Sequence, residues 1–147
     1  MCVLLLGLCL IGCSLKPASL RTASTPEQAK ALLSEAVSFY KANGRDKAFA
    51  EINNRRGKFV QGDLYIFVYA SNGVIAAHGG DVTQVGTDIS KRRDDNGKLF
   101  GREIMRVGEA GGSVDYVWQN PATGKVQPKT SFIIPFDGYR FGCGVYK

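Results

Sequence analysis

The chain has 147 residues, of which 44% are hydrophobic and 22% are charged, and this composition excludes the disordered, collagen-like and coiled-coil classes. A chain of this length, less a short leader, predicts one domain with one hydrophobic core. The formal charge is +6, but the densest basic cluster, residues 91–93, is followed directly by Asp94 and Asp95. Because nucleic-acid binders concentrate their basic residues on one stripe, we expect no nucleic-acid partner.

The N-terminus resembles an export leader. Residues 3–12 form an unbroken apolar stretch, which is too short to span a membrane. Residues 10–13 (Leu-Ile-Gly-Cys) resemble the bacterial lipobox, whose cysteine receives a lipid. This predicts a signal peptide over residues 1–13, lipidation of Cys13 and a polar tether over 14–24.

The leader sets the expected location of the protein. We expect a periplasmic protein that is attached to a membrane through its lipid anchor only, or that is free in the periplasm if Cys13 carries no lipid. No basic residue precedes Lys16, although a leader normally opens with one. The alternative interpretation is therefore an apolar helix buried in the domain.

Capping signals predict a long helix that begins after Thr25. Pro26 suits the first helical position, and Gln28 has the spacing of a capping box. Six apolar residues then recur at intervals of three and four: Ala29, Leu32, Leu33, Ala36, Val37 and Tyr40. This stripe predicts a helix that Gly44 ends. A second, short helix is predicted over residues 46–53.

Further along the chain the period becomes that of strands. Residues 63–69 are aromatic or β-branched on both phases, which predicts a strand covered on two faces. Asn72 and Gly73 predict a hairpin turn, with a returning strand over 74–78. A glycine-containing connection then leads to a predicted helix whose apolar face comprises Phe100, Ile104 and Val107.

Three further strands are predicted, over 113–118, 126–134 and 139–146, with hairpin turns between them. The element order predicts an α/β fold of the α+β type: a five-stranded antiparallel sheet with a long N-terminal helix and shorter helices packed on it. Helical crossovers do not recur between successive strands, and this argues against a doubly wound fold.

Residues 25–147 resemble the single Cache sensing domains of bacterial chemoreceptors and sensor kinases. The matching stretches are 37–41, 49–54, 57–59, 62–69, 72–73 with His78, 85–88, 114–118 with Asn120 and Pro121, 128–131, and 142–146. The resemblance implies one Cache domain over 25–147, with a PAS-like fold. It also implies a pocket for a small organic anion, commonly a carboxylate such as acetate, lactate or pyruvate.

The sequence departs from the family pattern in two places. The connection that starts at Gly79 is shorter than the Pro-containing connection of many members. No membrane-spanning, methyl-accepting or kinase segment follows residue 147 in this sequence. We therefore expect the domain to act through a signalling or envelope protein as its partner.

Five side chains are candidates for ligand contact. Tyr116 and Trp118 share one face of a strand, as do Tyr65, Phe67 and Tyr69, and the polar tips of Tyr and Trp can donate to a carboxylate. Lys129 matches a lysine that recurs in the family and could form a charge-assisted hydrogen bond. His78 is the one histidine and could donate from one ring nitrogen. The predicted set is Tyr69, His78, Tyr116, Trp118 and Lys129.

Each candidate has a plainer alternative. The aromatic residues could simply fill the core, Lys129 could be an exposed strand residue, and a histidine at the end of a strand is common. For the whole protein, the alternative is a structural or assembly lipoprotein of the cell envelope that uses the fold for protein docking.

Motifs of catalysis and metal binding are absent from the sequence. It contains no nucleophile elbow, Walker loop or HExxH. The four cysteines form no CxxC motif, which argues against a zinc site or covalent haem, and Cys143 is expected to be a buried, inert thiol. We expect a binding protein without enzymatic activity, cofactor or metal.

Overall fold

The computed structural model describes residues 23–147. The predicted signal peptide over 1–13, the lipidation site Cys13 and the tether up to residue 22 lie outside the described residues. The elements are α1 (Pro26–Asn43), α2 (Arg45–Asn53), β1 (Val60–Gln61), β2 (Leu64–Ala70), β3 (Ile75–His78), the 3-10 helix η1 (Val82–Gln84), α3 (Phe100–Met105), β4 (Gly112–Gln119), β5 (Val126–Phe136) and β6 (Tyr139–Tyr146).

Helix α1 begins and ends where the sequence predicts. The side chain of Thr25 accepts a hydrogen bond from the backbone N–H of Gln28, and the Gln28 side chain accepts one from the backbone N–H of Thr25 at 2.8 Å. This capping box satisfies two backbone donors that the helix itself leaves unpaired. Gly44 ends the helix at φ 80°, a conformation that a residue with a Cβ rarely adopts.

The strands form one antiparallel sheet in the order β3-β2-β6-β5-β4. The five predicted strands and the α+β class are thus confirmed. The sheet also contains β1, which pairs with β2 beside β3 and was not predicted. Two residues are too few to show an alternating pattern, so β1 left no signal in the sequence.

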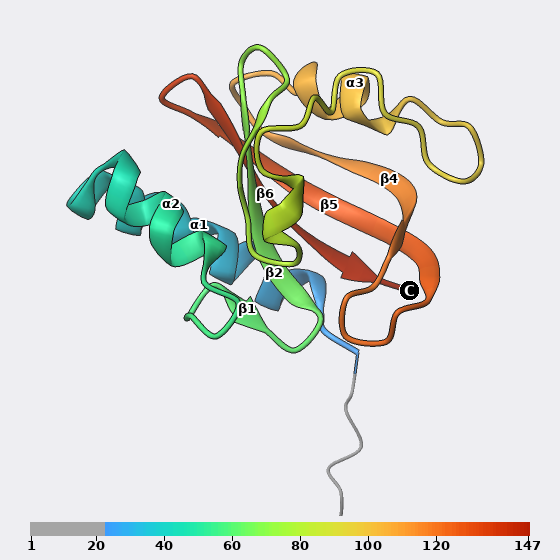
Figure 1. The fold of residues 1–147 in the computed structure, drawn as a ribbon, viewed down its shortest axis with the longest axis horizontal. Helices are drawn as coiled ribbons and strands as arrows, with labels where there is room; N and C mark the ends of the chain where they lie inside the picture. The colour runs from blue at the N-terminus through green and yellow to red at the C-terminus, as the bar shows by residue number, and fades with distance from the viewer. Residues whose placement is uncertain (1–22) are drawn as a thin grey trace, which may run out of the picture.

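The two faces of the sheet carry separate hydrophobic clusters. Helices α1 and α2 cover one face, and α3 with the long loop between β3 and α3 covers the other (Figure 1). Strand β2 contributes to both, because Leu64, Ile66 and Val68 point to the helices while Tyr65, Phe67 and Tyr69 point the other way. The sequence prediction of a strand covered on both faces is confirmed.

Helix α3 is shorter than predicted, because the predicted apolar face of the helix extended to Val107. It ends at Met105, and Val107 packs on the second cluster from the loop that follows. The backbone N–H of Val107 bonds to the carbonyl of Ile104, three residues back, so the chain tightens and leaves the α-helical path.

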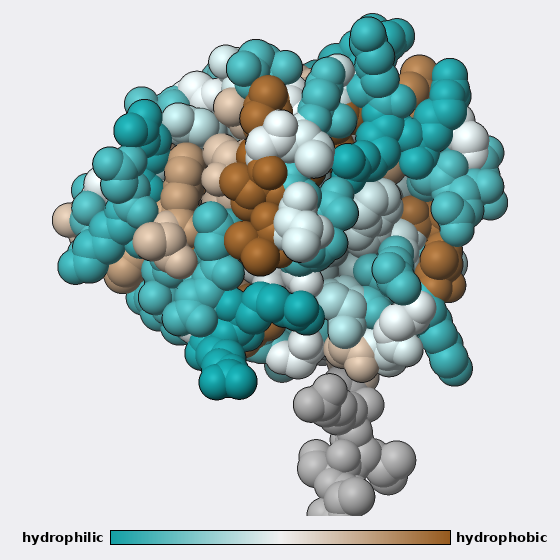
Figure 2. Space-filling view, viewed as in Figure 1, coloured by the Kyte–Doolittle hydropathy of each residue, from teal (hydrophilic) through white to brown (hydrophobic). Residues whose placement is uncertain are grey.

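The described part of the chain contains no helix that is both long and apolar enough to cross a membrane. Hydrophilic residues dominate the face shown in Figure 2, where apolar residues form a narrow central strip and a few smaller spots. Cys143 is fully buried among the residues of the helix-covered cluster, as predicted.

Candidate ligand-binding site

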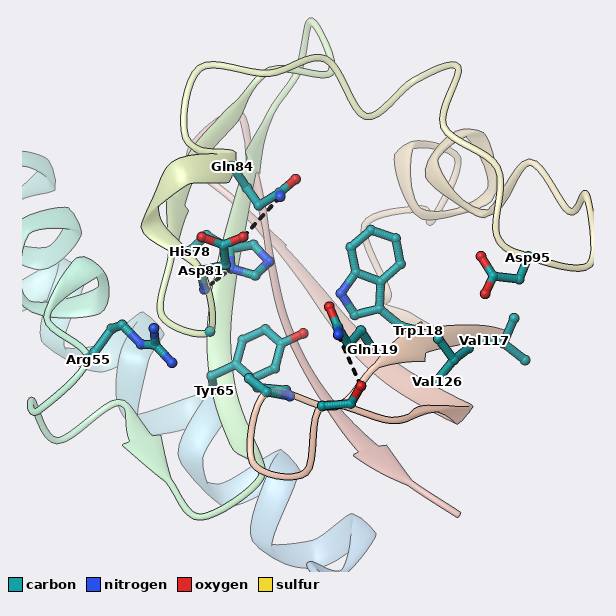
Figure 3. A pocket seen from close by; sticks show the side chains of 13 residues that line it. Arg55, Tyr65, His78, Asp81, Gln84, Asp95, Val117, Trp118, Gln119 and Val126 are labelled. Atoms are coloured by element: carbon teal, nitrogen blue, oxygen red, sulfur yellow. Dashed lines mark hydrogen bonds between the residues drawn. The ribbon is translucent and has the colours of Figure 1, made fainter.

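A pocket of about 580 Å³ lies on the face of the sheet opposite α1 and α2. Its walls come from the ends of β2 and β3, from the loop that contains η1, and from β4 with the hairpin that leads to β5 (Figure 3). The residues that line it are Arg55, Tyr65, His78, Gly80, Asp81, Gln84, Asp95, Val117, Trp118, Gln119, Pro121, Gly124 and Val126.

Three hydrogen-bonding groups converge in this pocket. Figure 3 shows the hydroxyl of Tyr65, one ring nitrogen of His78 and the indole nitrogen of Trp118 pointing toward the same space. The three residues come from three different strands, β2, β3 and β4. Each of these groups can donate a hydrogen bond, so the pocket presents donors that suit an anionic or carbonyl oxygen.

The proton of His78 is placed by its neighbour Asp81. The backbone N–H of Asp81 donates to Nδ1 of His78 at 2.9 Å, so in the neutral ring the proton is on Nε2. Burial lowers the pKa of His78 to about 3, and the nearby charge of Lys129 acts in the same direction. His78 is therefore neutral at physiological pH and offers an Nε2–H donor.

Lys129 is a buried cation behind the pocket. Its side chain is 1% exposed, and Nζ donates to the hydroxyl oxygen of Tyr65 at 2.7 Å. Aromatic rings surround the ammonium group, with centroids at 4.2 Å for Tyr65 and 4.8 Å for Tyr146. Burial lowers the pKa of Lys129 to about 7, because desolvation disfavours the charged form.

Lys129 forms no ion pair with an acidic side chain of the described residues. An ammonium group has three N–H donors, and one of them is used by Tyr65. Buried charges are normally paired and hydrogen-bonded. The structure thus holds a desolvated cation whose remaining donors find no acceptor among the described residues.

The hydroxyl of Tyr65 connects Lys129 to the pocket. It lies 3.2 Å from the hydroxyl of Tyr146, which donates to the backbone carbonyl of Gln119 at 3.0 Å. Since Tyr146 uses its own proton in that bond, the proton of Tyr65 is available to Tyr146 or to a ligand. Burial raises the pKa of Tyr65 well above its ordinary value, so the hydroxyl stays protonated.

Of the five residues predicted from the sequence, two line the pocket, one bonds to a lining residue and two lie in the core. His78 and Trp118 line the pocket. Lys129 does not line it but bonds to Tyr65, which does.

The remaining two predicted residues pack in the core behind the pocket and do not line it. Tyr116 stacks on Phe100 at 4.4 Å and shares a hydrogen bond with Ser131 at 2.9 Å. Tyr69 stacks on Phe67 at 4.7 Å.

Several lining residues were not in the predicted set. Tyr65 had a signal, because it shares a strand face with Phe67 and Tyr69. Arg55 and Gln84 had none, since Arg55 lies in the loop after α2 and Gln84 in the short helix η1, and only the fold brings them to the pocket. No group of three or more His, Cys, Asp or Glu side chains suited to a metal ion occurs within residues 23–147.

An antiparallel sheet with N-terminal helices on one face and a loop-walled pocket on the other defines a PAS-like sensor domain. The chain belongs to the single Cache domain 2 family, whose family model matches residues 24–146. The resemblance inferred from the sequence is thereby confirmed. Domains of this family are extracytoplasmic sensory domains that bind ligands and are not typically catalytic.

A sensor kinase shares part of the sequence. The chain is 32% identical over 87 residues to the sensor histidine kinase MctS of Rhizobium johnstonii. The aligned segment covers 57% of this chain and 19% of the kinase. The chain thus spans about a fifth of the length of this relative.

Solved structures of chemotaxis proteins share the fold. A methyl-accepting chemotaxis protein from Vibrio parahaemolyticus superimposes with a TM-score of 0.69 at 22% identity, over 82% of this chain and 86% of that one. A periplasmic sensor domain of a chemotaxis protein superimposes with a TM-score of 0.61 at 25% identity, over 82% of this chain and 88% of that domain. A Cache chemosensory domain whose structure is described for carboxylic acid recognition has a TM-score of 0.61 at 24% identity, over 82% of this chain and 86% of that domain.

Proposed function

We propose that the domain senses a short organic carboxylate, which binds in the pocket beside Tyr65 and neutralises Lys129. The hydroxyl of Tyr65, Nε2 of His78 and the indole nitrogen of Trp118 donate to the carboxylate or to a polar substituent on it. A signalling protein of the cell envelope receives the occupancy state. The protein has no enzymatic role in this proposal.

The buried ammonium group of Lys129 carries the proposal. An unpaired ion in a low-dielectric interior costs several kcal/mol, and no acidic side chain of the described residues forms an ion pair with it. A carboxylate in the pocket brings a negative charge next to Tyr65, whose hydroxyl is bonded to Nζ, and opposite charges attract strongly where water is excluded. The hydroxyl of Tyr65 already holds Nζ at the pocket side of the cage.

Two features favour binding over the docking alternative. A docking protein needs no pocket, whereas this domain has one with convergent donors. The large hydrophobic side chains that are exposed among the described residues are two separate valines, Val82 and Val126, and Val126 lines the pocket. Neither amounts to the broad apolar patch that marks many docking surfaces.

The relatives support the class of ligand and of partner. Carboxylic acid recognition is described for one Cache domain with the same fold, and the matched kinase and chemotaxis proteins are signalling proteins. In the present chain the argument for a carboxylate rests on the buried side chain of Lys129.

A thermal-shift screen tests the proposal. We expect acetate, lactate or pyruvate to stabilise the protein at pH 6, by ~2.7 kcal/mol at 100 times the dissociation constant, while the corresponding neutral amides do not. Lys129→Met should abolish the effect, and Lys91→Met, a change at an exposed lysine, should preserve it. Equal stabilisation of wild type and Lys129→Met, or none by any carboxylate, would contradict the proposal.

We further propose that the domain is exported and held at a membrane by a lipid on Cys13. The lipobox-like residues 10–13 support this. Mass spectrometry of the protein purified from membranes of a bacterial host should give a chain that begins at Cys13 and carries lipid. A Cys13→Ser variant should lack the lipid and leave the membrane fraction. An unmodified N-terminus in the wild type would refute the anchor.

A further inference from the structure

Strand β6 has glycines at positions 142 and 144, on the face of the sheet that carries the pocket. Its residues Phe141, Cys143 and Val145 point to the other face, toward α1 and α2. Strand β6 lies between β5, which carries Lys129, and β2, which carries Tyr65. In the register, Ser131 of β5 is opposite Gly144. The Lys129 side chain must therefore pass over β6 to reach the Tyr65 hydroxyl.

The space above Gly144 is filled by that side chain. A Cβ at position 144 would lie 2.4 Å from Cε of Lys129 and 2.5 Å from Oγ of Ser131, and real Cβ atoms essentially never come so close to other heavy atoms. The backbone itself does not demand glycine, because φ at 144 is not in the positive region. What excludes a side chain at this position is the occupied space above it.

We infer that Gly144 is a positioning residue for Lys129: by leaving the face of β6 bare, it opens the path along which the lysine reaches Tyr65. Gly142 plays the corresponding part for Phe67, whose Cζ would lie 2.1 Å from a Cβ at 142. That the position of Lys129 matters for ligand binding rests on the proposed function. The packing of Lys129 over Gly144 does not, because it is present in the ligand-free protein.

A methyl group at position 144 displaces the ammonium group from its cage. Because Lys129 is tightly enclosed, Cε has to move away from β6 to admit the methyl, and this lengthens the 2.7 Å contact between Nζ and Tyr65. The Gly144→Ala variant should then keep the fold but bind carboxylate more weakly, by about fivefold or more, since hydrogen bonds to charged groups are sensitive to such changes.

Lysine side-chain NMR on the ligand-free protein tests the positioning directly. The Lys129 signals are assigned by their loss in Lys129→Met, and two quantities are read: the NOE between the Lys129 Hε protons and the Tyr65 ring, and the titration midpoint of Nζ. Gly144→Ala should lose the NOE and shift the midpoint by about one unit, as expected of a relocated charge.

The matched control is Gly108→Ala. A Cβ at 108 meets nothing within 4 Å, and its φ is not positive, so both quantities should stay as in the wild type. An unchanged NOE and midpoint in Gly144→Ala would overturn the inference. If wild type binds no carboxylate in the thermal-shift screen, the proposed function fails, and the NMR result still decides the role of Gly144.

A pair of double variants covers the case in which Gly144→Ala does not fold. Combining it with Lys129→Ala vacates the space above position 144 and should restore the cooperative thermal transition, whereas combining it with Ser131→Ala should not. Rescue by Ser131→Ala alone, or by neither change, would show that Lys129 is not what requires the glycine and would overturn the inference.

Discussion

Nζ of Lys129 lies 2.7 Å from the hydroxyl oxygen of Tyr65, and both side chains are almost completely buried. The contact joins a cation that has no counter-ion among the described residues to a hydroxyl that lines the pocket. A carboxylate that reaches Tyr65 therefore approaches the buried charge as well.

Replacing Lys129 with methionine should abolish carboxylate binding and raise the free energy of unfolding. Methionine has a similar shape and needs no hydrogen bonds, so the cost of burying an unpaired ammonium disappears. We expect the free energy of unfolding of the ligand-free protein to rise by ~1–3 kcal/mol at pH 6, within the range seen when buried ion pairs are replaced by apolar residues. Urea denaturation measures it, with Lys91→Met expected to stay within about 0.5 kcal/mol of wild type. A large loss of stability in Lys129→Met would mean that the charge is already compensated without ligand.

Carboxylate affinity should fall as the pH rises above 7. The pKa of Lys129 in the ligand-free protein is lowered to about 7, and a carboxylate binds the charged form. Above that pH the charged fraction drops about tenfold per unit, and the affinity drops with it, while binding takes up a proton. Calorimetric titrations with pyruvate from pH 6 to pH 9, in buffers of different ionisation enthalpy, measure both effects. An affinity that stays constant or increases over this range would exclude Lys129 as the counter-charge.

The same lowered pKa has the opposite effect on the stability of the ligand-free protein. Between pH 7 and about 10.5 the unfolded chain holds a proton on Lys129 that the folded chain does not, so stability rises with pH across this window. The Lys129→Met variant should lack this component of the rise.

Removing the hydroxyl of Tyr65 should weaken binding without disturbing the fold. Tyr65→Phe deletes the group that accepts from Lys129 and faces the pocket, so we expect a loss of about 5- to 15-fold in carboxylate affinity, typical of one hydrogen bond. Tyr116→Phe is the matched control, because Tyr116 is a buried tyrosine on the same face whose hydroxyl bonds to Ser131 instead. Equal losses in the two variants would assign the effect to general packing.

His78 should remain neutral well into the acid range. Its pKa is lowered to about 3 by burial and by the charge of Lys129, so the C2 proton signal of this one histidine should not titrate between pH 5 and pH 8. From about pH 6.5 down to 3 the unfolded chain binds a proton that the folded chain does not. Stability therefore falls with decreasing pH in that window, and His78→Gln should make the fall shallower. A titration midpoint near 6.5 would refute the buried, neutral state.

The fold was largely predictable because its main signals are local. The capping box at Thr25 and the apolar stripe after it predicted α1, and the two-phase hydrophobicity of residues 63–69 predicted β2. The features that were missed have short or weak local signals. Strand β1 has two residues, η1 has three, and the end of α3 depends on how Val107 packs rather than on a breaker residue.

The site was less predictable because it depends on distances across the sheet. Alternation places Tyr65, Tyr69 and Tyr116 on one face, but nothing in the sequence tells which of them lines a pocket. Lys129 packs over Gly144 of β6, and only the strand register brings that glycine beneath its side chain. Arg55 reaches the pocket from a loop and Gln84 from the three-residue helix η1, and neither segment has a periodic pattern that predicts its course.

The most direct test of carboxylate binding is the indole N–H signal of Trp118. It is the one tryptophan of the chain, so its ¹H–¹⁵N resonance needs no assignment, and the indole nitrogen points into the pocket. Titration with acetate, lactate and pyruvate at pH 6 should move this resonance saturably for at least one of them in the wild type. The neutral amides should not move it, and neither should any carboxylate in Lys129→Met. A resonance unmoved by every carboxylate, or moved equally in Lys129→Met, would contradict a carboxylate site built on the buried lysine.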